Sequence, residues 1–69
     1  MKGNNEWFLE HCEEIFALCG ICYVVIKAER IIGIFETSPD AYAWVAEHDL
    51  SKEATVRYCD GTEKYIYLL

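Results

Sequence analysis

The sequence predicts an α+β domain in two layers, with two helices packed on an antiparallel four-stranded sheet. Three observations carry this prediction: helical hydrophobic spacing in residues 4–19 and 39–48, β-branched and aromatic runs between and after them, and an Asp-Gly turn signal near residue 60. The elements follow in the order α-β-β-α-β-β. A chain of 69 residues has room for a single compact domain, residues 1–69.

The first predicted helix begins at Asn4 or Asn5, whose side chains suit a helix N-cap, and runs to about Cys19. Gly20 follows, and glycine at this position suits the left-handed conformation that ends many helices. Apolar residues that recur at helical spacing predict the side that packs on the sheet: Phe8, Cys12, Ile15, Phe16 and Cys19, with Leu9 at their edge.

Residues 21–26 and 31–35 are rich in β-branched and aromatic side chains, and the charged segment 27–30 separates them. This pattern predicts a β-hairpin with a charged turn. Both runs are almost continuously apolar, which is typical of strands that are central in a sheet or covered on both faces. Gly33 indicates either a close neighbour or a bulge.

The second predicted helix, about Pro39 to His48, has a clear start signal. Ser38 can cap the free amides of its first turn, Pro39 has the φ favoured at the first helical position, and Asp40 suits the positive helix end. After it, residues 54–59 and 62–69 are predicted as strands joined by a two-residue turn at Asp60-Gly61. The resulting register assigns one side to the core: Ala54, Val56, Tyr58, Tyr65 and Tyr67.

The chain is acidic, with a net charge of −6, and residues 1–20 alone carry four glutamates against one lysine. Because this charge repels nucleic acid and anionic membranes, we expect neither as a direct partner. Residues 1–6 do not resemble a signal peptide, and no apolar run reaches the ~20 residues needed to span a membrane. We therefore expect a cytoplasmic protein.

The four cysteines, Cys12, Cys19, Cys22 and Cys59, leave several interpretations open. In a reducing compartment we favour buried thiols over disulfides, since unmodified cysteine packs as a small hydrophobe. A small zinc-stabilised domain is an alternative, with ligands from these cysteines and from His11 or His48. Redox catalysis by the Cys-x-x-Cys pair is disfavoured, because a helix C-terminus opposes thiolate formation.

The sequence contains no glycine-rich phosphate loop, no nucleophile elbow and no paired carboxylates beside an apolar pocket, so we expect no enzyme activity and no cofactor. The tyrosines near the C-terminus raise the alternative of a sheet that stacks nucleic-acid bases. The predicted register opposes it, because Tyr58 and Arg57 then lie on opposite faces.

The candidate functional surface lies on the first predicted helix. Glutamates occupy the side opposite the core, and three other residues project along one flank: Glu6, Glu10, Glu13 and Glu14, with Trp7, His11 and Leu18. Acidic groups steer the encounter with a basic surface, while Trp7 and Leu18 supply contact energy.

The sequence thus predicts a small interaction protein, without catalytic activity, that binds a basic protein surface. An acidic helix can also imitate the phosphate spacing of DNA, so the most specific form of this prediction is an inhibitor of a nucleic-acid-handling enzyme. In manner this resembles phage accessory proteins that antagonise host defence, without a motif that identifies a family. A self-associating structural module is the alternative, pairing through apolar flanks or through an edge strand that ends in Tyr67-Leu68-Leu69.

Overall fold

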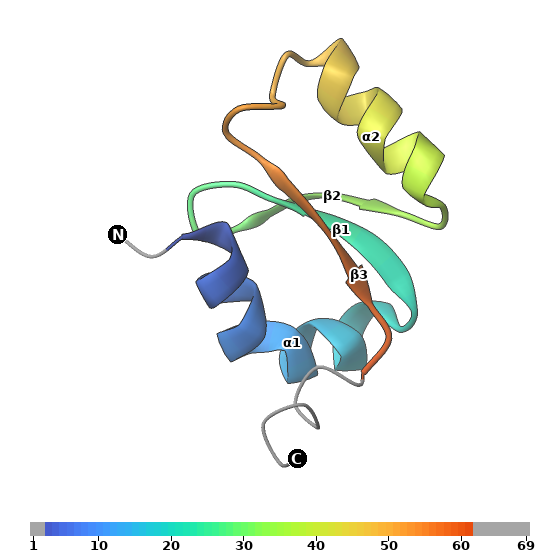
Figure 1. Cartoon of the computed structure of the whole chain (residues 1–69). Helices are drawn as coiled ribbons and strands as arrows, with labels where there is room; N and C mark the ends of the chain where they lie inside the picture. The colour runs from blue at the N-terminus through green and yellow to red at the C-terminus, as the bar shows by residue number, and fades with distance from the viewer. Residues whose placement is uncertain (1–2, 62–69) are drawn as a thin grey trace.

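The computed structural model describes residues 3–61, which contain two helices and three strands. The elements are α1 (Asn4–Cys19), β1 (Cys22–Ile26), β2 (Ile31–Phe35), α2 (Ser38–Glu47) and β3 (Thr55–Cys59). The strands form one antiparallel sheet in the order β2-β1-β3, so β1 is central (Figure 1).

The predicted four-stranded sheet in two layers is wrong. The sheet has three strands within residues 3–61, and the helices lie on its opposite faces, which gives three layers (Figure 1). The physical reason lies in β1: Val24 packs on the α1 side and Val25 on the α2 side, and both are fully buried. A strand that is apolar on both faces needs cover on both. The predicted strand at 62–69 lies outside the described residues.

The core on the α1 side combines one side of the helix with alternate residues of the sheet. Its buried members are Phe8, Cys12, Ile15, Cys22, Val24, Ile26 and Cys59. The predicted inner side of α1 is therefore confirmed for Phe8, Cys12 and Ile15, whereas Phe16 lies at its edge and is 36% exposed. The core on the α2 side is smaller, with Val25, Ala41 and Val45 buried.

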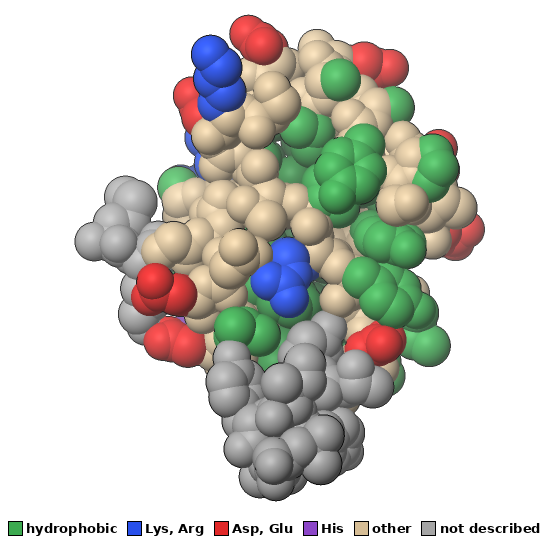
Figure 2. Space-filling view, in the orientation of Figure 1, with side chains coloured by type: hydrophobic (Ala, Val, Ile, Leu, Met, Phe, Trp, Pro, Cys, Tyr) green, Lys and Arg blue, Asp and Glu red, His purple; other side chains and the backbone are tan. Residues whose placement is uncertain are grey.

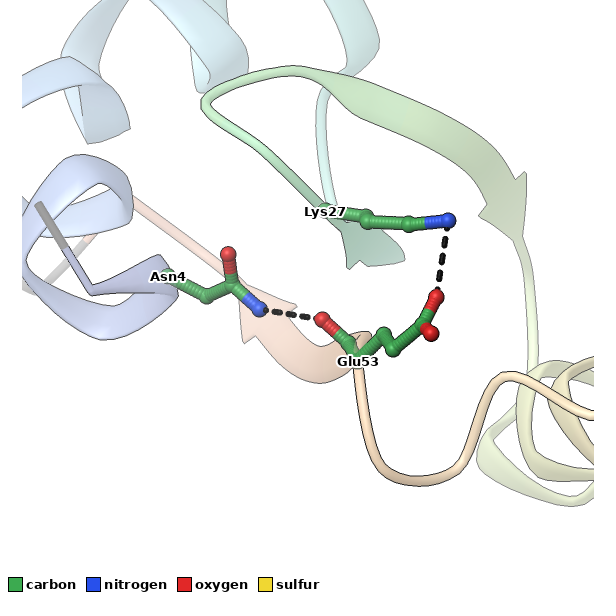
Figure 3. A network of polar contacts seen from close by, with 3 residues as sticks. All are labelled: Asn4, Lys27 and Glu53. Carbon is green, nitrogen blue, oxygen red and sulfur yellow. Dashed lines mark hydrogen bonds and ion pairs between the residues drawn. The ribbon is translucent and has the colours of Figure 1, made fainter. Parts of the chain in front are cut away.

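The start of α1 is joined to the region of β3 through Asn4. The N-cap of α1 is Gly3, which makes no side-chain cap hydrogen bond. Asn4 Nδ2 instead donates to the Glu53 carbonyl oxygen at 3.0 Å and to Thr55 Oγ1 at 3.1 Å. Figure 3 shows the first of these contacts beside the ion pair between Glu53 and Lys27, in which Lys27 Nζ lies 2.8 Å from Glu53 Oε2.

Asn5 makes a second connection of the same kind, because its Oδ1 accepts a hydrogen bond of 2.7 Å from Arg57 Nη1. The Arg57 guanidinium also lies 4.7 Å above the centre of the Phe8 ring. The predicted capping by Asn4 or Asn5 is therefore wrong, since both amides bind residues near or within β3 instead of the first turn of the helix.

The hairpin between β1 and β2 is confirmed. Its turn is of type I′: Ala28 and Glu29 have φ values of 52° and 60°, and Lys27 and Arg30 exchange backbone hydrogen bonds of 3.0 and 3.2 Å. Cover on both faces holds for β1 but not for β2, which lies at the edge of the sheet formed by residues 3–61 and has Ile34 52% exposed.

Both readings of Gly33 find support. The pairing of β2 with β1 shifts register next to this residue, as at a bulge. A Cβ at position 33 would also lie 2.8 Å from the Phe35 ring and 3.7 Å from the Trp44 ring. Glycine therefore allows both rings to pack closely against this part of the edge strand.

The predicted end of α1 at Gly20 and the predicted start of α2 at Ser38 are partly confirmed. Gly20 has a positive φ of 70°, and its N–H donates to the Phe16 carbonyl oxygen at 2.8 Å. The N-cap of α2 is Thr37 and not Ser38, because Thr37 keeps an extended backbone and its Oγ1 accepts from the Asp40 N–H at 3.3 Å. Ser38 is already the first helical residue.

Candidate protein-binding surface

The predicted glutamates lie on the solvent side of α1. Glu6, Glu10, Glu13 and Glu14 are all exposed, whereas the opposite side of the helix is buried against the sheet. Because residues three and four positions apart are neighbours on a helix, the carboxylates form one continuous stripe. We call these four residues the acidic surface, and Figure 2 shows acidic side chains at the left of the molecule, beside the N-terminal part of α1.

The predicted apolar flank, which consists of Trp7, His11 and Leu18, adjoins the acidic surface. Trp7 and His11 are stacked, with ring centres 4.5 Å apart and planes 23° from parallel. His11 Nδ1 lies 2.8 Å from the Trp7 carbonyl oxygen, and since a carbonyl only accepts, this nitrogen carries the hydrogen. Leu18 is 86% exposed. The flank thus combines an ordered aromatic pair with a fully accessible aliphatic side chain.

The same aromatic pair recurs in α2. Trp44 and His48 have ring centres 4.4 Å apart, and His48 Nδ1 lies 2.9 Å from the Trp44 carbonyl oxygen. Residues 7–11 and 44–48 share the pattern Trp-x-x-Glu-His, a repeat that the sequence analysis missed although it is readable in the sequence. Since residues four apart face each other on a helix, the stack itself is a local feature. The two copies differ in burial, because His11 is half-buried whereas His48 is exposed.

A row of aromatic side chains on the α2 face was also missed. Tyr23 of the central strand is paired with Phe35 on one side and with Tyr58 on the other, and its ring centre lies 4.9 Å from that of Tyr58. Tyr58 is 45% exposed, so its assignment to the core is wrong. Its predicted separation from Arg57 holds, because Arg57 packs on the α1 side. The missing information was the strand order.

All four cysteines are thiols and contribute to the core on the α1 side. Three are buried, while Cys19 is half-buried at the end of α1. Cys22 contacts both Cys19 and Cys59. Burial is the main cause of the raised pKa of the Cys22 thiol, and the neighbouring Cys19 thiol raises it further. Within residues 3–61 no three His, Cys, Asp or Glu side chains are arranged to hold a metal ion, so the zinc alternative gains no support there.

No family model matches the chain, and neither a curated protein nor a solved structure is detectably similar to it. Between Gly3 and Gly61, neither helix has the length and apolar composition needed to cross a lipid bilayer.

Proposed function

We propose that the protein is a binding protein, without catalytic activity, that docks through α1 on a basic surface of another protein. The observation that carries the proposal is the position of the acidic surface next to the apolar flank on the accessible side of one helix. The buried side of the same helix packs on the sheet, and contacts from Asn4 and Asn5 hold its first turn against the β3 region. A rigid helix presents its side chains to a partner with little loss of conformational entropy.

The two parts of this surface have different roles. An exposed ion pair contributes only about 0.2–1 kcal/mol, so the carboxylates mainly steer and orient the encounter. Covering the Leu18 side chain, which is 86% exposed, contributes about 1.5–3 kcal/mol in addition. Trp7 is already partly buried and stacked on His11, so it offers a preformed edge to the partner.

The most specific form of the proposal is an inhibitor of a nucleic-acid-handling enzyme. Such enzymes carry basic grooves that bind phosphate groups. The stripe has four carboxylates, from Glu6 to Glu14, over about 12 Å of helix, or about one per 4 Å, against roughly 3.4 Å per phosphate along one DNA strand. The apolar flank adds contact energy that a phosphate backbone does not offer.

The test compares affinity capture by the wild type and by three variants of the full chain. Glu10→Lys combined with Glu13→Lys reverses charge in the middle of α1, away from both helix ends and their partial charges. Glu36→Lys combined with Glu47→Lys makes the same change in net charge elsewhere on the exposed surface and is the matched control. Leu18→Ser removes the accessible aliphatic group.

The proposal predicts that the wild type and the control capture one protein equally well. The α1 charge variant, Glu10→Lys with Glu13→Lys, should capture about tenfold less of it, and Leu18→Ser should also capture less. Two lost attractions and two new repulsions, of about 0.35 kcal/mol each, give this factor. The captured protein is then purified, and its affinity for each form is measured. If every captured protein responds equally to the α1 variant and to the control, the acidic surface is not the binding site.

Self-association remains a second candidate because of one observation. In the described sheet β2 has only β1 as a neighbour, and its exposed Ile34 has no acidic or basic residue beside it within the strand. An apolar edge of this kind can pair with a second copy. A mass that rises with concentration in sedimentation, and that Ile34→Lys returns to the monomer, would support this candidate; a strict monomer would remove it.

A further inference from the structure

Three of the four thiols form a contact chain at the junction of α1, β1 and β3. Cys22 contacts Cys19 on one side and Cys59 on the other. Cys22 and Cys59 are also direct partners in the register of β1 and β3. We call Cys19, Cys22 and Cys59 the thiol triad. The fourth cysteine, Cys12, belongs to the same core, where its thiol donates to the Leu9 carbonyl oxygen at 3.4 Å.

Within the described residues, Cys19 is the most exposed member of the triad. Cys19 is half-buried, Cys22 is 4% exposed and Cys59 is fully buried. Gly20, with φ 70° and ψ −152°, reverses the chain between α1 and β1 and so brings Cys22 back against Cys19. A reagent from solution is therefore expected to react first with Cys19, whose thiol is in contact with that of Cys22.

We propose that Cys19 and Cys22 are a site of reversible disulfide formation, by exchange with a low-molecular-weight disulfide of the glutathione type. The Cys19 thiolate attacks one sulfur of the small disulfide, so that a Cys19–S–S bond forms and the original S–S bond breaks. The first small thiolate leaves and takes up the proton that Cys19 lost. The Cys22 thiolate then attacks the Cys19 sulfur, and the second small thiolate leaves with the proton of Cys22. Two protein thiols are oxidised, and one small disulfide is reduced to two thiols.

The surroundings favour slow equilibration over rapid turnover. Burial raises the pKa of the Cys22 thiol, so little of the attacking thiolate is present near neutral pH. The site thus suits a reversible modification that follows the thiol–disulfide ratio of its compartment. It does not depend on the proposed partner-binding role of α1.

The test uses the full wild-type chain with reduced and oxidised glutathione as the probe. The chain is equilibrated at a series of glutathione ratios, quenched with acid, alkylated and digested with a glutamate-specific protease. Cleavage after Glu10, Glu14, Glu29 and Glu53 leaves Cys12, the pair Cys19 and Cys22, and Cys59 in three different peptides. Mass spectrometry then identifies each linkage without the need for a variant.

We expect the peptide 15–29 to change from doubly alkylated to internally linked as the proportion of oxidised glutathione rises, while Cys12 and Cys59 stay alkylated. Cys19→Ala should abolish the internal bond, and Cys12→Ala, the matched control in the same core, should leave it unchanged. Complete alkylation of the pair in excess oxidised glutathione would overturn the proposal. A stable mixed disulfide on Cys19, or a bond from Cys22 to Cys59, would overturn it equally.

Discussion

The turn between β1 and β2 allows a quantitative prediction, because two ordinary residues occupy positions that favour glycine or asparagine. Ala28 and Glu29 have φ values of 52° and 60°. A non-glycine residue in the left-handed region costs roughly 1–2 kcal/mol, and Asn-Gly is the pair preferred in type I′ turns. The double variant Ala28→Asn, Glu29→Gly should therefore relieve strain without changing the hairpin.

The expected gain follows from two opposing effects. Relief of strain contributes roughly 2 kcal/mol over both positions. The greater freedom of glycine in the unfolded chain costs about 0.5–1 kcal/mol. The net gain is about 1 kcal/mol, which corresponds to a rise of about 4–8 °C in the melting temperature for a domain of this size.

Thermal and urea unfolding followed by circular dichroism measure this gain. The matched control places the same pair in a loop without positive φ, as Ser51→Asn, Lys52→Gly, and should leave stability unchanged or lower it. If the turn variant is no more stable than the wild type, the backbone of this turn is not under the strain inferred here.

Three further predictions concern the contacts around the sheet. Arg57→Ala loses the hydrogen bond to Asn5 and the contact with the Phe8 ring, so urea unfolding should show a loss of about 1–2 kcal/mol, whereas exposed Lys52→Ala should cost less than about 0.5 kcal/mol. Gly33→Ala brings a methyl group to 2.8 Å from the Phe35 ring, so the melting temperature should fall by an amount equivalent to about 1–3 kcal/mol; an unchanged value would contradict this packing. The rate of Cys19–Cys22 bond closure should rise about tenfold per pH unit below the raised pKa of Cys22, since only the Cys22 thiolate attacks. A closure rate that does not change with pH, measured in acid-quenched time points, would refute this order of steps.

The elements that were predicted correctly have local signals. The inner side of α1 follows from helical spacing, and the β1–β2 hairpin follows from two apolar runs with a charged turn between them. The start of α2 was placed within one residue, because Thr37 and Ser38 are both good caps and only the backbone angles decide between them.

The features that were missed depend on contacts between distant segments. Whether Asn5 caps its own helix or binds Arg57 depends on where β3 lies. The position of α2 on the opposite face from α1 follows from β1 being central, and the strand order also decides that Tyr58 is exposed.

The candidate site shows the same division. The exposed glutamates and Leu18 follow from helix geometry alone. The contact of Cys22 with Cys59 does not, because it requires the pairing of strands that are far apart in the sequence.

The most direct test of the proposed function is the dissociation constant of the captured partner as a function of salt concentration, measured with the wild type, the α1 charge variant and its control. The α1 variant, Glu10→Lys with Glu13→Lys, should bind about tenfold more weakly and with a shallower salt dependence, because it removes two attractions and adds two repulsions. The control, Glu36→Lys with Glu47→Lys, should bind within about twofold of the wild type. Equal losses in the two variants, or an α1 variant that binds like the wild type, would contradict binding through α1.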